Sequence, residues 1–129
     1  MRAAGRFFLI STFALLAPGA MAQAPEPVAI SLTNYAFTPS NLDLKVGAPY
    51  RLHFTNTESK DHNFSAPQFF AAGQLAAEDQ AKVKSGTVDV AAGQSVDIVV
   101  TPGRAGTYSF TCTHFMHSTM GMHGTITVQ

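Results

Sequence analysis

The sequence predicts an all-β protein, either a sandwich or a barrel, with one small helical insertion. Short runs of alternating apolar and polar residues recur along the chain, and Gly or Pro turn signals separate them. The chain of 129 residues is 46% hydrophobic and only 12% charged, against about 25% charged in an average domain. Eight basic residues balance eight acidic ones, which argues against disorder and against binding of nucleic acid.

The first 22 residues predict a cleaved secretory signal peptide. Arg2 and Arg6 precede an apolar run over 7–20, and residues 20–22 (Ala-Met-Ala) provide a small-residue cleavage site. The run of about 14 residues is shorter than the roughly 20 that a spanning helix needs, so an uncleaved membrane anchor is the less favoured alternative. We therefore expect a periplasmic protein of 107 residues after removal of 22 from 129, with a formal charge of −2.

After the signal peptide, residues 23–27 predict a short Pro-rich flexible arm, and one folded domain is expected over 28–129. Alternating runs predict strands, in chain order, at 28–33, 42–46, 50–55, 86–90, 95–101, 106–112 and 124–128. The insertion around 68–84 is rich in Ala, Gln, Glu and Lys, and we expect a short helix over 75–83 within it. Phe69 and Phe70 are expected to anchor this flap in the core.

The unusual chemistry of the sequence is concentrated in residues 112–123, where the only cysteine lies among three histidines and three methionines. A lone cysteine in an exported chain cannot form an internal disulfide, and is a free thiol, an intermolecular link or a metal ligand. A thiolate with imidazoles and a thioether suits copper, and two His, one Cys and a weak axial Met form a blue-copper electron-transfer site.

The spacing of these residues is compatible with a single site. Cys112 ends a predicted strand and Gly124 begins the next, so one loop carries Cys112, His117 and a methionine, and a fourth donor must come from elsewhere. His62 is the natural fourth donor, because it follows the predicted strand over 50–55 and is placed to reach the same end. The alternative is that His62 is an ordinary turn residue with no ligand role.

From about Ala29 to Gln129 the sequence resembles the cupredoxin family of type 1 blue copper proteins, of the plastocyanin and azurin kind. The resemblance rests on an early FTPSNLDLKVG stretch, the His62-Asn63 pair, and a closing Cys-x4-His-x4-Met pattern before a terminal strand. It implies a Greek-key β-sandwich that binds one copper ion. The ligands it implies are His62, Cys112 and His117 in the equatorial plane and Met122, in preference to Met120, as the axial ligand.

The resemblance also implies that Asn63 ties the two ligand-bearing loops together. His53 lies between two residues expected to point inward, so its side chain should face away from the core. We expect His114 and His123 to face water or lie beside the site without binding the metal. For Phe115 and Met116 we consider two alternatives: the side chains form an apolar collar around the site, or they cover the end of the core.

The donor set and the resemblance predict a monomeric electron carrier that cycles between Cu(I) and Cu(II), exchanges electrons with a redox protein partner and is not an enzyme. The alternative is a copper-handling protein, that is, a chaperone, scavenger or resistance factor that delivers copper to an acceptor protein. Met116, Met120, His114 and His123 motivate this alternative, because they are soft or imidazole donors in excess of the four ligands. We expect no nucleic-acid partner, because the chain has no excess of basic residues. We also expect no small-molecule substrate, since the sequence contains neither G-x-S-x-G nor G-x-x-x-x-G-K.

Overall fold

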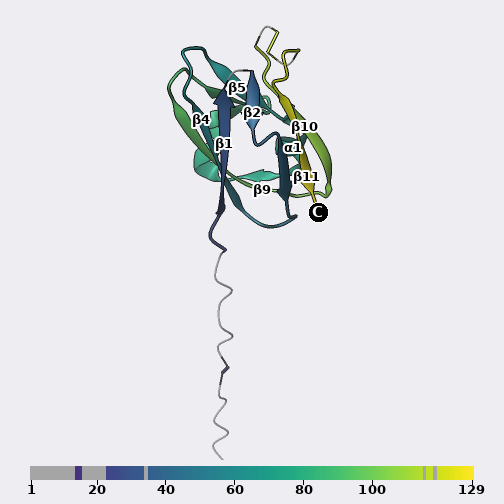
Figure 1. Ribbon diagram of the computed structural model, residues 1–129. Coiled ribbons are helices and arrows are strands. Elements are labelled where there is room, and N and C mark those ends of the chain that lie inside the picture. The colour runs from purple at the N-terminus through teal and green to yellow at the C-terminus, as the bar shows by residue number, and fades with distance from the viewer. Residues whose placement is uncertain (1–13, 16–22, 34, 115, 118) are drawn as a thin grey trace, which may run out of the picture.

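The computed structural model describes residues 14–15, 23–33, 35–114, 116–117 and 119–129. The strands within it, from Glu26 to Val128, form a β-sandwich of two sheets (Figure 1). Residues 1–13 and 16–22, and with them the predicted cleavage site, lie outside the described residues. Within the part of the chain that the structure describes, none of the helices has the length and apolar character needed to cross a bilayer.

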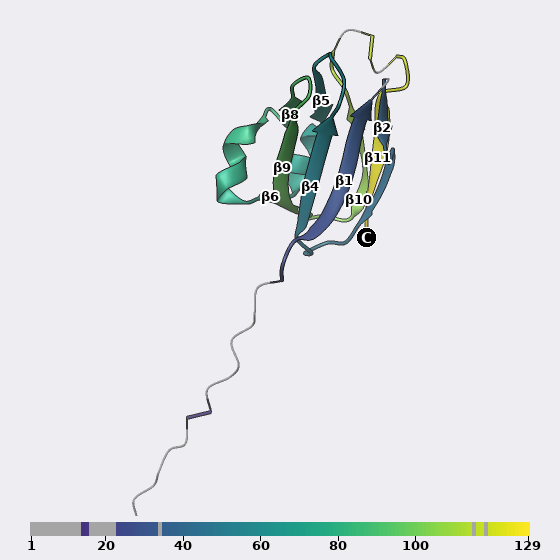
Figure 2. The ribbon, with the colours of Figure 1, turned by 60° about the vertical axis from the view of Figure 1, so that its left-hand side comes forward.

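The first sheet has the strand order β2-β1-β4-β9-β6 (Figure 2). Its strands are β1 (Glu26–Thr33), β2 (Ala36–Thr38), β4 (Tyr50–Asn56), β9 (Ser95–Thr101) and β6 (Gln74–Leu75). β1 and β4 run parallel with Ile30 opposite Phe54, whereas β4 and β9 are antiparallel. The parallel pair needs a crossover connection, and the chain makes it through the other sheet.

The second sheet has the strand order β3-β11-β10-β5-β8-β7. Its strands are β3 (Asn41–Leu44), β11 (His123–Val128), β10 (Gly106–Thr111), β5 (His62–Ser65), β8 (Thr87–Val90) and β7 (Val83–Lys84). Because strands that are distant in sequence lie side by side in both sheets, the arrangement confirms the predicted Greek-key β-sandwich.

Aromatic rings fill the space between the sheets, and Phe64 lies at their centre. Its ring centroid is 4.6 Å from that of Phe110, 4.8 Å from Phe54, 5.8 Å from Phe37 and 6.2 Å from Phe70. Offset and edge-to-face pairs at these distances are favourable beyond the burial of area alone. This packed core supports β5, the strand that begins with His62.

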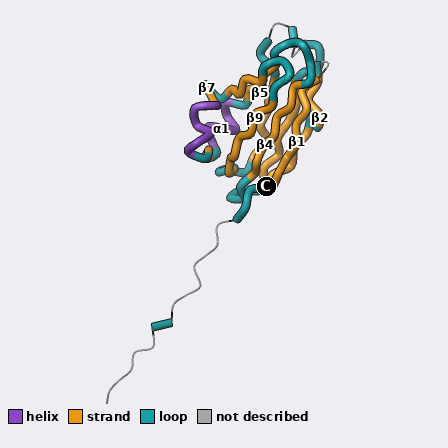
Figure 3. The backbone as a smooth tube through the Cα atoms, turned by 90° about the vertical axis from the view of Figure 1, so that its left-hand side faces the viewer, coloured by secondary structure: helices purple, strands orange, loops and turns teal. Residues whose placement is uncertain are grey.

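The insertion around 68–84 is helical, as predicted, but it contains two short helices in place of one. A helix over 75–83 was expected, but the structure has an α-helix, α1 (Pro67–Ala72), then β6, a 3-10 helix, η1 (Ala77–Lys82), and β7 (Figure 3). Pro67 at the first helical turn favours the earlier start. The two ends of the predicted helix pair with strands instead, Leu75 with Val100 and Val83 with Val88.

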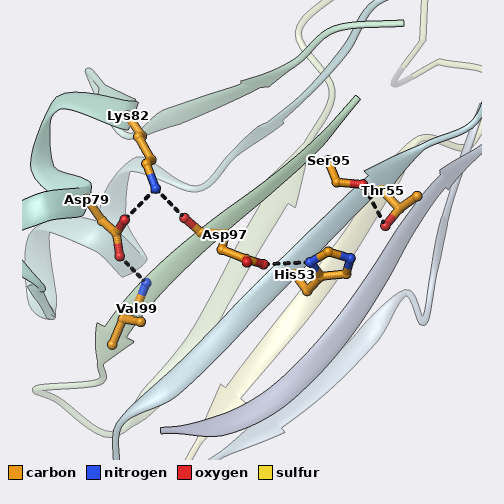
Figure 4. A network of polar contacts seen from close by, with 7 residues as sticks. All are labelled: His53, Thr55, Asp79, Lys82, Ser95, Asp97 and Val99. Atoms are coloured by element: carbon orange, nitrogen blue, oxygen red, sulfur yellow. Dashed lines mark hydrogen bonds and ion pairs between the residues drawn. The ribbon is translucent and has the colours of Figure 1, made fainter. Parts of the chain in front are cut away.

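A buried carboxylate fixes the 3-10 helix to the first sheet (Figure 4). Asp79 is 4% exposed, and it accepts hydrogen bonds from Lys82 Nζ at 2.7 Å and from the Val99 N–H at 2.8 Å. Lys82 Nζ also donates to the Asp97 carbonyl oxygen at 3.1 Å. Burial by itself raises the pKa of Asp79, but the Lys82 ammonium and the Val99 N–H outweigh it, so this pKa lies below its ordinary value of 3.8.

The other predictions of strands and core residues were confirmed, except for four short strands. Phe69 and Phe70 are buried as expected, and the seven predicted strands are present with ends shifted by at most two residues. The short strands β2, β5, β6 and β7 were not predicted. β5 is buried at all four positions, so it lacks the alternation on which the prediction of strands relied.

Candidate metal centre

The site lies at one end of the sandwich and is built mainly by two neighbouring strands of the second sheet. β5 begins with His62, and β10 ends one residue before Cys112. The strands are antiparallel neighbours with Thr111 opposite Ser65, so the start of β5 and the end of β10 fall at the same edge. The loop that follows β10 carries Cys112, His117 and Met122 at this end, opposite the C-terminus (Figure 2).

Three of the predicted ligands converge there. One donor atom each from His62, Cys112 and His117 lies within 4.8 Å of the other two. His117 Nδ1 is 3.2 Å from His62 Nδ1 and 3.3 Å from Cys112 Sγ. His62 and Cys112 are each 1% exposed and His117 is 8% exposed, so the cluster is almost closed to water.

The spacing of these atoms fits a shared metal ion. Nitrogen and sulfur ligands bind a first-row metal at roughly 2.0 and 2.3 Å, so two of them around one ion stand about 3 to 4 Å apart. The distances of 3.2 and 3.3 Å fall in this range. Among the His, Cys, Asp and Glu side chains of the described residues, His62, Cys112 and His117 form the group whose donor atoms are close enough to hold an ion. A buried thiol with two imidazoles is a donor set that suits copper.

The surroundings favour the neutral form of His117, which is the form that binds a metal. Burial lowers the pKa of His117, and the neighbouring His62, His114 and Lys60 lower it further, while Glu58 acts weakly in the opposite direction. The imidazole is therefore uncharged at neutral pH and its lone pair is available.

Asn63 ties the two ligand-bearing segments together, as the resemblance implied. Its Nδ2 donates to Thr113 Oγ1 at 2.7 Å, and its Oδ1 accepts the Thr113 N–H at 2.9 Å. Asn63 follows His62 and Thr113 follows Cys112, so this pair of hydrogen bonds fixes the spacing of two donors directly. Such contacts outside the ligand set orient the ligands of metal sites.

The two methionines proposed for the fourth position differ sharply in burial. Met122 is fully buried, whereas Met120 is 57% exposed. The main chain of Met122 bonds to both ligand segments: its carbonyl accepts the Cys112 N–H at 3.0 Å and its N–H donates to the His117 carbonyl at 3.0 Å. These contacts favour Met122 over Met120, and an axial role for Met122 stays a prediction.

The remaining histidines are placed much as expected. His53 lies between the buried Leu52 and Phe54 and faces out, where its Nδ1 contacts Asp97 Oδ1 at 2.5 Å (Figure 4). His123 is exposed at the start of β11, and His114 is half-buried with its ring centroid 5.5 Å from that of His117. Neither belongs to the three-residue cluster found among the described residues.

Two residues beside the site were not predicted. Tyr35 packs edge-on against His117, with ring centroids 4.9 Å apart, and its backbone has a left-handed φ of 58°. Glu58 Oε2 lies 3.7 Å from His62 Nε2. The sequence signal for Glu58 was a carboxylate four residues before a predicted ligand.

Of the predicted apolar collar, Met116 is 53% exposed, and Phe115 lies outside the described residues.

Comparison with known proteins agrees with this architecture. The family model for a cupredoxin-like domain matches residues 5–128. Auracyanin from the photosynthetic bacterium Roseiflexus castenholzii, reduced with dithionite, is 22% identical and superposes with a TM-score of 0.63 over 83% of this chain and 99% of its own.

Two further solved structures are similar. Auracyanin A, described as a "blue" copper protein from Chloroflexus aurantiacus, is 19% identical with a TM-score of 0.59 over 82% of this chain and 100% of its own. Auracyanin B is 21% identical with a TM-score of 0.61 over 84% and 93% of the two chains. At these identities the likeness establishes the fold. A comparison with curated proteins found no match.

Proposed function

The chain belongs to the cupredoxin-like domain family, and on this premise we propose that it is a single-copper electron carrier. In this proposal His62, Cys112 and His117 are the equatorial ligands and Met122 is the weak axial ligand. The observation that carries the proposal is the convergence of one thiol and two imidazoles in a buried cluster at the end of the sandwich. This donor set is that of blue-copper electron-transfer sites, and the likeness in fold to auracyanin A supports it.

The chain's part in this function is to hold the donors in one arrangement. Bound copper would supply one-electron chemistry by alternating between Cu(I) and Cu(II). His62 begins β5 and Cys112 directly follows the neighbouring strand β10, and the next residues, Asn63 and Thr113, are hydrogen-bonded to each other. The donor atoms therefore keep their spacing in both oxidation states, which lowers the reorganisation that accompanies electron transfer.

Of the three clustered ligands, His117 lies nearest to solvent. It is 8% exposed, against 1% for His62 and for Cys112. In the proposed function a redox protein partner docks at this end, and the electron passes through the edge of the His117 ring.

We propose that the protein works as a monomer in the periplasm after removal of residues 1–22. We also propose that it acts on no small-molecule substrate, binds no nucleic acid and is not an enzyme.

A copper-handling role is the second candidate, and the exposure of two thioethers favours it. Met116 and Met120 are 53% and 57% exposed in the loop that carries His117. Thioether sulfur is a soft ligand that binds Cu(I), so these side chains offer a path for stepwise transfer of the ion to an acceptor protein. In this case the buried cluster stores copper for delivery.

Spectroscopy of the copper-loaded protein tests the primary proposal. The protein with one equivalent of Cu(II) should show an intense visible band from charge transfer between the Cys112 thiolate and the metal. The Cys112→Ser variant should bind Cu(II) without that band. A colourless wild-type Cu(II) complex, or a Cys112→Ser variant with unchanged colour, would contradict the proposal.

Kinetics separates the carrier from the copper-handling protein. A carrier exchanges electrons rapidly and reversibly and keeps its copper when mixed with a metal-free acceptor protein. A copper-handling protein transfers the ion, and the Met116→Ala/Met120→Ala double variant should slow that transfer while leaving the visible band unchanged. Loss of the band on these exposed substitutions would contradict both assignments, because neither side chain belongs to the buried cluster.

A further inference from the structure

The two ring nitrogens of His62 lie in different surroundings. Nδ1 faces the centre of the site, 3.2 Å from His117 Nδ1. Nε2 lies on the other side of the ring, is buried, and has no hydrogen-bond partner among the described residues. A buried ring nitrogen without a partner is unfavourable, and a metal ligand usually uses its second nitrogen to fix the tautomer and the ring plane.

A carboxylate lies beside this nitrogen. Glu58 Oε2 is 3.7 Å from His62 Nε2, and the Glu58 side chain is 25% exposed. The distance exceeds that of a hydrogen bond by less than 1 Å. A small rotation of the Glu58 side chain therefore brings an acceptor oxygen within bonding distance of the buried nitrogen.

The loop between β4 and β5 holds the main chain of Glu58 in place beside His62. The carboxamide of the buried Asn56 organises it: Oδ1 accepts the Glu58 N–H at 3.0 Å, and Nδ2 donates to the Lys60 carbonyl at 2.8 Å and to the Val90 carbonyl at 2.9 Å. Glu58 thus begins a loop that is bonded at its start, near its end, and to the adjacent strand β8. The backbone of Glu58 is fixed, and only its side chain needs to move.

We propose that Glu58 is a positioning residue for His62. Its carboxylate accepts the Nε2–H, so the proton stays on Nε2 and the Nδ1 lone pair points at the site. The negative charge also makes His62 a stronger donor to the metal, which favours Cu(II) over Cu(I). This inference rests on the proposed copper function for its redox consequence, whereas its tautomer consequence holds for the metal-free protein as well.

The variants Glu58→Gln and Glu58→Ala separate charge from hydrogen bonding. Gln keeps an acceptor oxygen and removes the charge, while Ala removes both. The matched control is Asp61→Asn, which removes the same charge from the residue next to His62 but keeps the oxygen that accepts the Ala92 N–H at 2.9 Å. Glu58 and Asp61 are not fully buried, so the three variants should fold.

The first readout is nitrogen NMR of the His62 ring in the metal-free protein. The wild type and Asp61→Asn should hold the proton on Nε2, and Glu58→Ala should shift the ring toward a mixture of tautomers. The second readout is the copper-loaded protein. Glu58→Gln and Glu58→Ala should raise the reduction potential and weaken Cu(II) affinity by about 10- to 100-fold, with a smaller change for Asp61→Asn.

The possible outcomes are distinct. An unchanged tautomer in Glu58→Ala, or a potential shift in Asp61→Asn as large as that in Glu58→Gln, would overturn the positioning role. Failure of the wild type to bind copper would refute the proposed function. In that case, the NMR result on metal-free protein still decides whether Glu58 holds the His62 ring.

Discussion

The link between Asn63 and Thr113 should stabilise the folded protein even without metal. Asn63 is 5% exposed, and its carboxamide makes two hydrogen bonds to Thr113, one to the side chain and one to the main chain. A hydrogen bond of this kind contributes a net of about 0.5–1.5 kcal/mol. Asn63→Ala removes both, so we expect a loss of about 1–3 kcal/mol in the free energy of unfolding, against a total of about 5–15 kcal/mol for a domain.

Urea denaturation of the metal-free protein measures this loss. Thr113→Val keeps the shape of the side chain and removes only the Oγ1 acceptor, so it should cost about 0.5–1.5 kcal/mol. Adding Thr113→Val to Asn63→Ala should cost almost nothing further, because the side-chain bond is already absent. Asn41→Ala, an exposed asparagine in β3, is the matched control and should stay within about 0.5 kcal/mol of the wild type.

Two results would refute this reasoning. One is a value for Asn63→Ala within about 0.5 kcal/mol of the wild type, which would mean that water replaces both bonds at no cost. The other is full additivity of the two substitutions, since a shared hydrogen bond requires a coupling energy between its partners.

Three further predictions, one of them with a matched control substitution, are read from urea denaturation. Phe64→Ala empties the centre of the core and should cost about 3–5 kcal/mol, whereas Val46→Ala, at a residue 45% exposed, should cost under about 0.5 kcal/mol. In Gly124→Ala the new Cβ would lie 2.2 Å from the Ser40 carbonyl oxygen, so we expect a loss of about 1–3 kcal/mol. Because the pKa of Asp79 is lower when folded, its ionised form stabilises the fold above pH 3.8, and this contribution disappears as the pH falls below that value. Asp79→Asn should therefore be less stable at neutral pH and should lose less stability on acidification.

Each of these expectations has a clear counter-result. Equal costs for Phe64→Ala and Val46→Ala would show that the ring cluster does not carry the core. A Gly124→Ala protein as stable as the wild type would show that β11 shifts freely away from Ser40. An Asp79→Asn protein that lost the same stability as the wild type in acid would assign the acid sensitivity to other carboxylates.

The sandwich was predictable because most of its strands are buried on one face. Leu52 and Phe54 point inward while His53 points out, and this alternation is visible in the sequence. β5 escaped prediction for the opposite reason, since it is buried at all four positions and opens with His62 and Asn63, which are poor strand signals. The helix expected over 75–83 is a shorter 3-10 helix, η1, because Asp79 bonds to β9 and the residues at its two ends pair with strands of the two sheets. These contacts do not appear in local composition.

The candidate site was predictable because three of the four implied ligands, Cys112, His117 and Met122, come from one loop with regular spacing. The meeting of His62 with Cys112 depends on the adjacency of β5 and β10, which only the tertiary fold reveals. The approach of Glu58 to His62 Nε2 likewise depends on the shape of a loop that Asn56 closes. The sequence therefore indicated which donor residues cluster, and the resemblance pointed to Asn63 as their link, but neither indicated the roles of Asn56 and Glu58.

X-ray absorption at the copper edge tests the central proposal most directly, because it counts the atoms around the ion. For the protein loaded with one equivalent of copper, we expect two nitrogen neighbours at about 2.0 Å and one short sulfur neighbour at about 2.3 Å or less. The short sulfur neighbour should vanish in Cys112→Ser, and one nitrogen neighbour should vanish in His62→Ala. A copper environment of nitrogen and oxygen alone in the wild type would show that the ion binds elsewhere and would contradict the account.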